Sequence, residues 1–534
     1  MTALAGTGSL IRLALRRDRV LLPIWLVLFV LIVQSSASAW GALYDTAEER
    51  ASIIAQIGTN PTFKALYGLN YGDSSEALFV WRYGATIGVF VALMSLLIVV
   101  RHTRAEEESG RLELVSAGVV GRLAALTSSL IVVFAANLVL AAAVTAILAG
   151  AGFDAVGSLA FALGLALAGM LFATIAGLTA QVTESARFAN ALAGIVLGAT
   201  YLLRALGDTS ADSGLGWLSW LSPTGWAARL KPFAGDEWWV VGLFAVSIAV
   251  VAAVAYALNL RRDFGAGLIA PRPGPTHARP GLKSPLALAW RLQRGLLYGW
   301  IGGFVFLGLV FGGVANGIDD ILGSNPQMTE IIAKLGQGSL IEIYMDMVMG
   351  IVALIVSVYS IQAALRLRAE ETGLLAEPVL ATAVGRVKWA ASHLVFAVLG
   401  PALLLLVGGL VMGLIYGLAI DDVGGQITTS VKSSLVQLPA VWVLTGFALL
   451  LFGFLPRLIA AAWAALVVFV LLGQLGPILE LSQGAMDVSP FTHIPKTGGD
   501  TFSAVPLIWL VAIALILCAA GLFGFRRRDL ATAG

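Results

Sequence analysis

Charged residues are scarce in this chain of 534 residues: Asp, Glu, Lys and Arg make up 12% of it, against 59% that are hydrophobic. A soluble domain carries about 25% charged residues and has too much surface to be this apolar, so a soluble fold is excluded. Cysteine is nearly absent as well, because Cys518 is the only one. This excludes an internal disulfide and a cysteine-rich metal site, and we interpret Cys518 as a small packing residue in the last apolar run.

The sequence also lacks the patterns that nucleotide-binding and catalytic sites need. No stretch fits G-x-x-x-x-G-K-[ST], and the nearest is GLKS at 281–284, so we expect no phosphate-binding loop in this chain. The four histidines are scattered without metal or Ser-His-Asp spacing. We therefore expect no cofactor, metal or catalytic residue here, and the net charge of +2 gives no reason to expect a nucleic-acid partner.

Long apolar runs are what the sequence has in abundance. A hydrocarbon core about 30 Å thick needs roughly twenty apolar residues in a helix, and runs that are continuous rather than alternating exclude a membrane β-barrel. We predict an all-α polytopic membrane protein with twelve spans, near 20–40, 83–101, 123–150, 156–181, 187–206, 238–260, 296–317, 343–364, 387–419, 431–455, 458–479 and 504–525.

The basic residues predict how these spans are threaded. With a cytoplasmic N-terminus, the inner segments hold 24 of the 33 Lys and Arg but 11 of the 31 Asp and Glu, as positive-inside sorting requires. We expect both termini in the cytoplasm, in a multi-pass plasma-membrane protein. The basic stretch SLIRLALRRDR at 9–19 is expected to be a retained anchor that lies along the inner leaflet.

The middle of the chain divides it into two halves. Residues 270–285 contain five prolines, which is typical of a semi-rigid linker. It separates residues 1–269 from residues 286–534, with six predicted spans in each. IIAQIG at 53–58 is similar to IIAKLG at 331–336, and both halves end in Arg-Arg-Asp. Because six is an even number, we predict parallel six-helix repeats about a pseudo-twofold axis along the membrane normal, with cargo passing at the seam between them.

An acidic cassette recurs at a spacing of 264 residues. Residues 104–122 (first cassette) and 368–386 (second cassette) are identical at ten of nineteen positions. Each begins as an extension of a span, is interrupted by Gly110 or Gly373, and continues as a short helix that carries Glu113 or Glu377. A solvated loop is the alternative, but acidic clusters are unusual at a cytoplasmic membrane edge. We predict a pair of docking elements for a symmetric partner.

At these residues the chain resembles a known family. The run RAEEE-x-G-R-L-E-L, the closing Val-Gly-Arg, the duplicated six-span half and the Ser-Pro pairs at 222–223 and 489–490 resemble the permease of actinobacterial ABC-type antibiotic exporters, the tetronasin and polyketide group of the type-two ABC exporter superfamily. The resemblance implies export of hydrophobic antibiotics or drug-like and lipidic compounds, with ATP and Mg²⁺ bound by two copies of a separate cytoplasmic ABC ATPase subunit.

The resemblance also implies that the cassettes are coupling helices seated in clefts of the ATPase. The residues expected at those contacts are Arg104, Glu106, Glu107, Glu108, Arg111, Glu113 and Arg122 in the first cassette, and Arg368, Glu370, Glu371, Glu377 and Arg386 in the second. The second copy differs from the first because Thr372 replaces a Glu, Leu374 replaces Gly110 and Pro378 replaces Leu114. Whether the two halves couple equally is therefore left open.

An ion-coupled secondary multidrug transporter is the competing class. Such proteins also commonly have twelve spans, but they need an ionisable group deep in the membrane, and the middles of these spans are almost free of carboxylates. The cytoplasmic loops also lack the Gly-x-x-x-Asp-Arg pattern of the major facilitator group. We rank an ATP-coupled exporter above a secondary transporter, and a membrane enzyme last.

The spans that flank the cassettes are expected to line the cargo path. Aromatic and thioether side chains suit large apolar cargo, although ordinary packing is the alternative for each. The candidates are Phe79, Trp81, Phe90 and Met94 in the first half and Tyr344, Met347 and Met349 in the second. Arg82 and Asp346, also 264 residues apart, are hypothesised to form an outer gate pair. Five tryptophans in 213–239 predict an interfacial hairpin.

Overall fold

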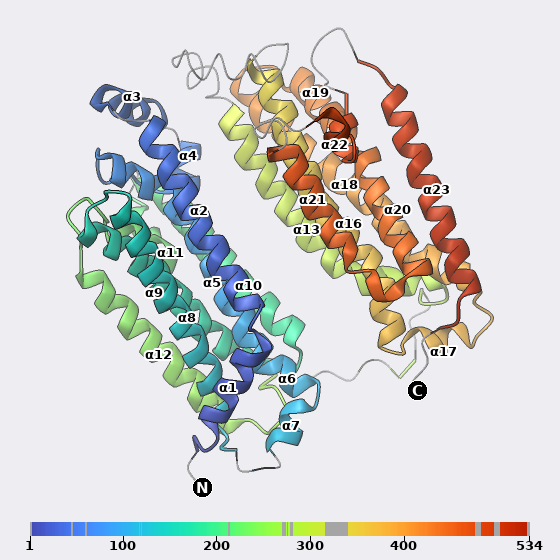
Figure 1. The fold of residues 1–534 in the computed structure, drawn as a ribbon, viewed down its shortest axis with the longest axis horizontal. Helices are drawn as coiled ribbons and strands as arrows, with labels where there is room; N and C mark the ends of the chain where they lie inside the picture. Colours follow the sequence, from blue (N-terminus) through green and yellow to red (C-terminus); the bar gives the residue numbers. More distant parts are fainter. Residues whose placement is uncertain are drawn as a thin grey trace. The chain divides into compact units, whose positions relative to one another are not determined.

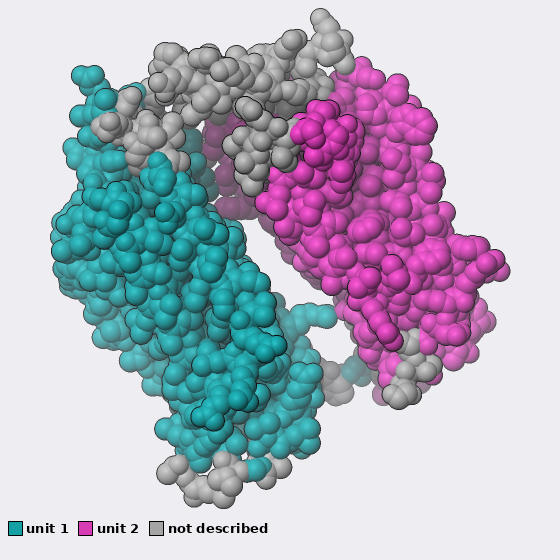
Figure 2. All heavy atoms as spheres, in the orientation of Figure 1, with its two compact units in different colours: residues 1–274 teal, residues 275–534 magenta. Residues whose placement is uncertain are grey.

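The structure is a computed structural model that describes residues 3–43, 46–58, 61–116, 118, 120–211, 214–269, 274, 276–277, 281–315, 340–475, 482–495 and 502–530. The chain forms two compact units, residues 1–274 (unit 1) and 275–534 (unit 2) (Figure 2). The boundary between them lies inside the proline-rich segment 270–285.

Unit 1 is built from helices throughout the part that the structure describes. They are α1 (Thr7–Arg17), α2 (Leu21–Leu43), α3 (Ala47–Ile57), α4 (Pro61–Tyr67), α5 (Ser75–His102), α6 (Arg104–Glu108), α7 (Arg111–Ser116), α8 (Ala124–Gly150), α9 (Ala155–Val182), α10 (Ala186–Thr209), the 3₁₀ helix η2 (Gly216–Leu221), α11 (Pro223–Arg229) and α12 (Trp239–Arg261). Helix is the expected state for these apolar runs because it satisfies every backbone polar group within the segment.

Unit 2 is also helical in its described residues. Its helices are α13 (Pro285–Ala315), α16 (Leu340–Thr372), α17 (Ala376–Leu380), α18 (Arg386–Ala419), α19 (Val423–Leu435), α20 (Leu438–Phe454), η3 (Pro456–Leu458), α21 (Ala461–Leu475), α22 (Gln483–Met486), η4 (Pro490–His493) and α23 (Val505–Arg527). The predicted all-α class is confirmed for the part of the chain that is described.

Eleven helical segments in the described residues are long and apolar enough to cross a membrane. They coincide with eleven of the twelve predicted spans. The remaining prediction, 458–479, falls on α21, whose 15 residues cover about 22 Å at 1.5 Å per residue, less than a hydrocarbon core of about 30 Å. Residues 476–481 lie outside the described residues, so the twelfth span stays a prediction.

Polar caps, rather than the edges of apolar runs, decide where two spans begin. The Ser74 hydroxyl accepts the backbone N–H of Ala77 at 3.1 Å, so α5 begins at Ser75, eight residues before the predicted span. Asp422 likewise accepts the N–H of Gly425 at 3.1 Å, and α19 begins at Val423, where the sequence predicted a start at 431. A side-chain oxygen that satisfies a free N–H of the first turn allows a helix to include polar residues that a hydropathy window rejects.

Small residues and buried polar pairs hold the helices of unit 1 together. Asn137 of α8 donates to the hydroxyl of Ser95 of α5 at 2.9 Å, and both side chains are fully buried. Gly169 of α9 faces this pair, where a Cβ would come within 2.2 Å of the Asn137 Oδ1. Close approach at glycine and interhelical hydrogen bonds are what drive helix association in lipid, so this crossing fixes α5, α8 and α9 as one packed group.

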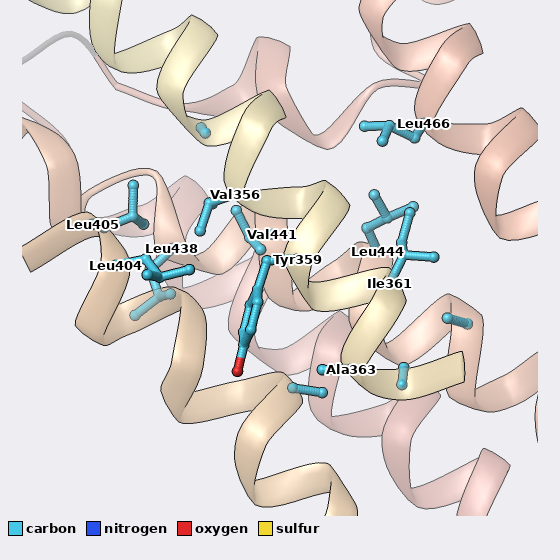
Figure 3. Close-up of a cluster of buried hydrophobic side chains, with 14 of the residues drawn as sticks. Val356, Tyr359, Ile361, Ala363, Leu404, Leu405, Leu438, Val441, Leu444 and Leu466 are labelled. Atoms are coloured by element: carbon cyan, nitrogen blue, oxygen red, sulfur yellow. The ribbon is translucent and has the colours of Figure 1, made fainter. Parts of the chain in front are cut away.

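The core of unit 2 lies between α16, α18, α20 and α21. Figure 3 shows Tyr359 and Val356 of α16 facing Leu404 and Leu405 of α18. The buried Tyr359 hydroxyl donates to the carbonyl of Phe396 at 3.2 Å, which satisfies its polar end inside an apolar cluster. A second glycine crossing joins α20 to α23, since a Cβ on Gly453 would come within 2.1 Å of the Gly521 carbonyl.

Within each unit, the cassette and a chain terminus lie at the same end. In unit 1 the cassette helices α6 and α7 lie beside α1 and the N-terminus, and α3 and α4 lie at the opposite end (Figure 1). In unit 2, α17 lies near the C-terminus, and α19 and α22 lie at the opposite end. The first and second cassettes therefore occupy corresponding ends of their units.

Candidate functional site

The first cassette turns sharply after α5. The span ends at His102, the short helix α6 covers Arg104–Glu108, and Gly110 adopts a left-handed φ of 72° before α7 begins at Arg111. Glycine tolerates this conformation because it has no Cβ. The interruption expected at Gly110 is thus present, and it separates the buried start of the cassette from the short helix that carries Glu113.

The interruption predicted at Gly373 is present in the second cassette, where α16 ends. Helix α16 runs without a break from Leu340 to Thr372, and the left-handed residue is Leu374, with a φ of 58°, rather than Gly373. Leu374 aligns with Gly110, so both cassettes turn at the same position of the repeat. A leucine in this region brings its Cβ close to the following carbonyl, which costs about 1–2 kcal/mol.

Substitutions at Leu374 and Gly110 should change the free energy of unfolding in opposite directions. Leu374→Gly is expected to raise the free energy of unfolding by about 1 kcal/mol, because it removes the left-handed strain from a side chain that is 40% exposed. Gly110→Ala should lower it by a similar amount, since φ is unfavourable although nothing lies within 4 Å of the new Cβ. Denaturant titration of the purified protein measures both, and an equal sign for the two changes would contradict this account.

The start of the first cassette is a buried ion-pair network. Glu107 receives two hydrogen bonds from the Arg262 guanidinium, at 2.7 and 2.8 Å, and lies 3.1 Å from Arg104. It also accepts the backbone N–H of Gly265 at 2.7 Å. The Arg104, Glu107 and Arg262 side chains are 0%, 2% and 9% exposed. Paired, bidentate contacts of this kind compensate for burying the charges.

The two arginines of this network also hold the chain around it. Arg104 donates to the carbonyl of Ala180 at 2.7 and 2.9 Å, at the end of α9. The Arg262 Nε donates to Gln181 at 2.6 Å. Arg122, which closes the cassette, donates to the carbonyls of Arg262 and Asn259, the latter at 3.2 Å. The first cassette is therefore fastened to the ends of α9 and α12.

The second cassette repeats three of these contacts. Glu371, which aligns with Glu107, pairs with Arg528 at 2.5 and 2.7 Å and with Arg368 at 3.2 Å. The closing Arg386, which aligns with Arg122, donates to the carbonyl of Arg528 at 2.7 Å. Arg262 and Arg528 are each the middle residue of the Arg-Arg-Asp that ends a half. The second cassette is thereby fastened to the end of α23, as the first is to α12.

Arg262 and Arg528 are functional candidates that the sequence analysis missed. The signal was present, because the Arg-Arg-Asp recurs at the end of both halves, but nothing in the sequence joined it to the cassettes. These contacts show that part of the sequence identity between the two cassettes serves packing inside each unit. Five of the cassette residues pair with other residues of their own unit: Arg104, Glu107, Arg122, Glu371 and Arg386.

The far ends of the cassettes are exposed. Glu113 is exposed and its neighbour Leu114 is 80% exposed. In the second cassette Glu377 is exposed, and Leu375 is 57% exposed. In each cassette a hollow lies nearby: one of about 320 Å³ is lined by Glu107 and Leu112, and one of about 510 Å³ is lined by Glu371 and Glu377. A carboxylate next to an exposed leucine, displayed beside a hollow, is a surface on which another protein can dock.

The other acidic residues of the cassettes have partners near them. Glu106 pairs with Arg17 of α1 at 2.5 Å and lies 3.8 Å from Arg111, and Glu370 pairs with Arg366 at 2.5 Å. Glu108 accepts the backbone N–H of Ala186 at 2.8 Å, at the start of α10. The first cassette is thus also joined to the N-terminal helix, whereas Glu370 pairs with Arg366 of its own helix, α16.

Asp18, between α1 and α2, strengthens that junction. It is fully buried against His102 and lies 3.3 Å from Arg101. Burial alone would raise its pKa, but the hydrogen bond with His102 and the positive charges of His102, Arg101 and Arg17 outweigh burial and lower the pKa. Asp18 is therefore a carboxylate that ties the N-terminal helix to the end of α5.

The residues predicted to line a cargo path separate into buried and exposed groups. Phe79, Trp81 and Met94 in unit 1 and Tyr344 and Met349 in unit 2 are buried within their own units. Phe90 is 48% and Met347 53% exposed. Phe79 packs edge-on against Phe153 and Phe161, with centroid distances of 5.5 and 6.1 Å, so its contacts are those of a core residue.

The hypothesised gate pair stays a prediction. Arg82 lies over the ring of Tyr67, with its guanidinium carbon 4.1 Å from the centroid. The side chain of Asp346 lies outside the described residues, as do residues 331–336 of the second outer repeat. The tryptophan-rich segment forms the two short helices η2 and α11, and the Ser222 hydroxyl accepts the N–H of Gly225 at 3.4 Å. Its place at the membrane interface stays a prediction.

Comparison with known proteins places the chain among membrane transporters. A family model described as the C-terminal domain of the multidrug efflux system permease Rv1217c matches residues 8–260 and 282–526. The chain is 43% identical over 526 residues to the multidrug efflux system permease protein Rv1217c of Mycobacterium tuberculosis, an alignment that spans 98% of this chain and 95% of that protein.

Proposed function

The chain belongs to the family of the multidrug efflux system permease Rv1217c, and from this premise we propose that it is the membrane-spanning permease of an ATP-driven ABC exporter. In this proposal it moves hydrophobic antibiotics or drug-like and lipidic compounds out of a bacterial cell. It binds neither ATP nor Mg²⁺, which belong to two copies of a cytoplasmic ABC ATPase subunit. The likeness to the type-two exporters of antibiotic-producing actinobacteria belongs to the same proposal.

The proposed architecture is twelve spans in two parallel repeats, with both termini and both cassettes in the cytoplasm. It is supported by the recurrence of one contact pattern: Glu107 with Arg104 and Arg262, and Glu371 with Arg368 and Arg528. The family match supports it too, with one matched segment on each side of the linker. A shared pattern of buried charges is what a duplication retains when its lipid-facing residues change freely.

Coupling is assigned to the exposed tips of the cassettes. Each tip presents a glutamate and a leucine, Glu113 with Leu114 and Glu377 with Leu375, from a base that is fastened to the last helix of its unit. The base must be rigid, because a movement of the tip is transmitted to the spans only if the contacts between them stay intact. This observation, an exposed tip on a doubly fastened base in both units, carries the proposal.

The secondary-transporter alternative has less support from the buried charges. The buried carboxylates of the described residues are Asp18, Glu107, Asp208, Glu370 and Glu371. They lie at the ends of helices and each is paired with a basic side chain. A coupling ion needs a carboxylate that it can reach in mid-membrane, whereas these are committed to structural pairs near the membrane edges.

Reconstitution tests the proposal directly. The purified chain is placed in vesicles with and without a candidate ABC ATPase subunit, and uptake of a hydrophobic dye is followed with ATP or with an imposed proton gradient. We expect transport only with the ATPase subunit and ATP. An ATPase whose catalytic glutamate is replaced by glutamine serves as the matched control. Transport by the chain alone on a proton gradient would instead establish a secondary transporter.

A further inference from the structure

Helix α1 carries an exposed basic face beside the first span. Arg12 and Arg16 lie one helical turn apart and both are exposed, as is Arg19 in the turn that follows the helix. Leu13 and Leu15 beside them are 45% and 50% exposed. We call these five residues the basic face of α1. Arginines flanked by exposed leucines are typical of a helix that contacts both the headgroups and the acyl chains of a bilayer.

The only carboxylate near this face is already committed elsewhere. Asp18 is the only acidic residue among residues 1–44, and it is fully buried, where it pairs with His102 and lies 3.3 Å from Arg101. Three residues separate α1 from α2, which begins at Leu21, and they reach about 10 Å when extended. The basic face therefore lies close to the headgroups that surround the first span.

The opposite side of α1 contacts the start of the first cassette. Arg17 pairs with Glu106 at 2.5 Å, and the two side chains are 29% and 15% exposed. Leu10 and Ala14 line a small hollow together with Leu112 of α7, so α1 lies against the cassette helices. A partly buried ion pair is screened less by salt than an exposed one, and it joins the position of α1 to that of the cassette.

The residues before α1 contact the far end of the same cassette. The carbonyl of Ala5 accepts the backbone N–H of Gly121 at 2.8 Å, and the carbonyl of Ala3 accepts that of Leu123 at 3.0 Å. These two bonds lie on either side of Arg122, which closes the cassette. The N-terminal segment therefore holds the first cassette at both of its ends.

Unit 2 has similar arginines on a different helix. Residues 14–25 and 289–300 are identical at six of twelve positions, namely Ala, Arg, Arg, Leu, Leu and Trp. The two arginines that unit 2 shares are Arg291 and Arg294, which are exposed like their counterparts in the basic face. They lie within the unbroken helix α13, so in unit 2 this segment is the first part of the helix that forms the span.

The link to the cassette also differs in unit 2. Leu292 stands in the place of Arg17 and cannot form an ion pair. Glu370, the counterpart of Glu106, pairs instead with Arg366 of its own helix at 2.5 Å. The ion pair that joins a basic N-terminal helix to a cassette is therefore a feature of unit 1.

We propose that the basic face of α1 binds anionic phospholipid headgroups of the inner leaflet, and that this binding stabilises the first cassette but not the second. Each arginine near an anionic surface strengthens binding about fivefold, so the face selects an anionic over a zwitterionic bilayer. Lipid is favoured over a protein partner because exposed leucines flank the arginines directly before a span. The inference rests on the proposed cytoplasmic coupling role of the cassettes, to which it adds a regulator.

The test is hydrogen–deuterium exchange of the purified full chain in nanodiscs of phosphatidylcholine, with and without phosphatidylglycerol. We expect the anionic lipid to slow amide exchange in the first cassette at least about fivefold, because a ligand that binds the ordered α1 stabilises the contacts that α1 makes. The second cassette is the internal control, and its exchange should change less than about twofold. Inorganic phosphate added to phosphatidylcholine discs should have no effect.

Matched variants separate the basic face from charge in general. Arg16→Gln with Arg19→Gln should reduce the slowing to less than about twofold, whereas Arg291→Gln with Arg294→Gln, at the corresponding positions of unit 2, should leave it unchanged. Arg17→Leu introduces the residue that unit 2 has at this position. This variant should still associate with spin-labelled phosphatidylglycerol, but exchange at the start of its first cassette should no longer depend on the lipid.

Three outcomes would overturn the inference: no effect of phosphatidylglycerol on the wild-type chain, equal slowing in both cassettes, or equal slowing by inorganic phosphate. Exchange of α1 that slows with the ATPase subunit in phosphatidylcholine, and not with anionic lipid, would identify a protein partner and would also overturn it. The circular dichroism and melting temperature of each variant establish that it is folded. Because the lipid measurement contains neither ATP nor ATPase, its failure is distinct from a failure of ATP-driven transport.

Discussion

Replacing Glu107 by Ala is expected to lower the free energy of unfolding by about 3–5 kcal/mol, the range for removing one partner of a buried ion pair. The change leaves Arg104 and Arg262, 0% and 9% exposed, without their shared carboxylate. It also leaves the N–H of Gly265 without its acceptor. Because whole domains have stabilities of about 5–15 kcal/mol, we expect much less folded protein in the membrane. Denaturant titration in detergent measures the effect.

The repeat supplies the internal comparison for this prediction. Glu371→Ala should have an effect of the same size in unit 2, because Glu371 is as deeply buried and pairs with Arg528 and Arg368. Glu113→Ala, in the same cassette as Glu107 but exposed, should stay within about 0.5 kcal/mol of the wild type. A loss below 1 kcal/mol for Glu107→Ala would show that the network is not a structural clamp.

Reversing the charge at both tips, with Glu113→Lys and Glu377→Lys, is expected to reduce ATP-driven transport at least tenfold. In the proposed complex these carboxylates face the ATPase, and like charges placed across an interface cost several kcal/mol. Folding stability should change by less than about 0.5 kcal/mol, since both side chains are exposed. Vesicle transport and copurification of the ATPase subunit measure the loss.

Glu48→Lys is the control for the change in charge. Glu48 is an exposed residue of α3, at the end of unit 1 opposite the first cassette (Figure 1), so its reversal should leave transport and ATPase binding unchanged. Transport at the wild-type rate in the doubly reversed variant would remove the tips from the coupling path. A lower free energy of unfolding in that variant would instead show that Glu113 and Glu377 stabilise the fold.

Together the two experiments distinguish Glu107 from Glu113, two glutamates of one cassette that have different contacts. Glu107 and Glu113 are equivalent in the sequence analysis, since both recur at the same spacing in both halves. In the structure one of them is buried between arginines and the other is exposed to solvent. Glu107 is expected to determine how much protein is folded, and Glu113 how well the folded protein couples to the ATPase.

The sequence by itself determined the membrane class and most of the spans. Apolar runs about twenty residues long leave a helix as the state that satisfies the backbone in lipid, so composition and length were sufficient. Errors occurred at helix starts such as Ser75, where the Ser74 cap extends a helix through polar residues. The cassettes were also visible in the sequence, because the duplicated residues lie at a constant spacing.

Only the tertiary structure decided which cassette residues face inward. Glu107 meets Arg262 across 155 positions of sequence, and Glu371 meets Arg528 across 157, and no local pattern contains such a pairing. Burial and long-range pairing are properties of packed helices, whereas periodicity and composition describe each helix alone, and this is why the sequence located the elements but not their contacts.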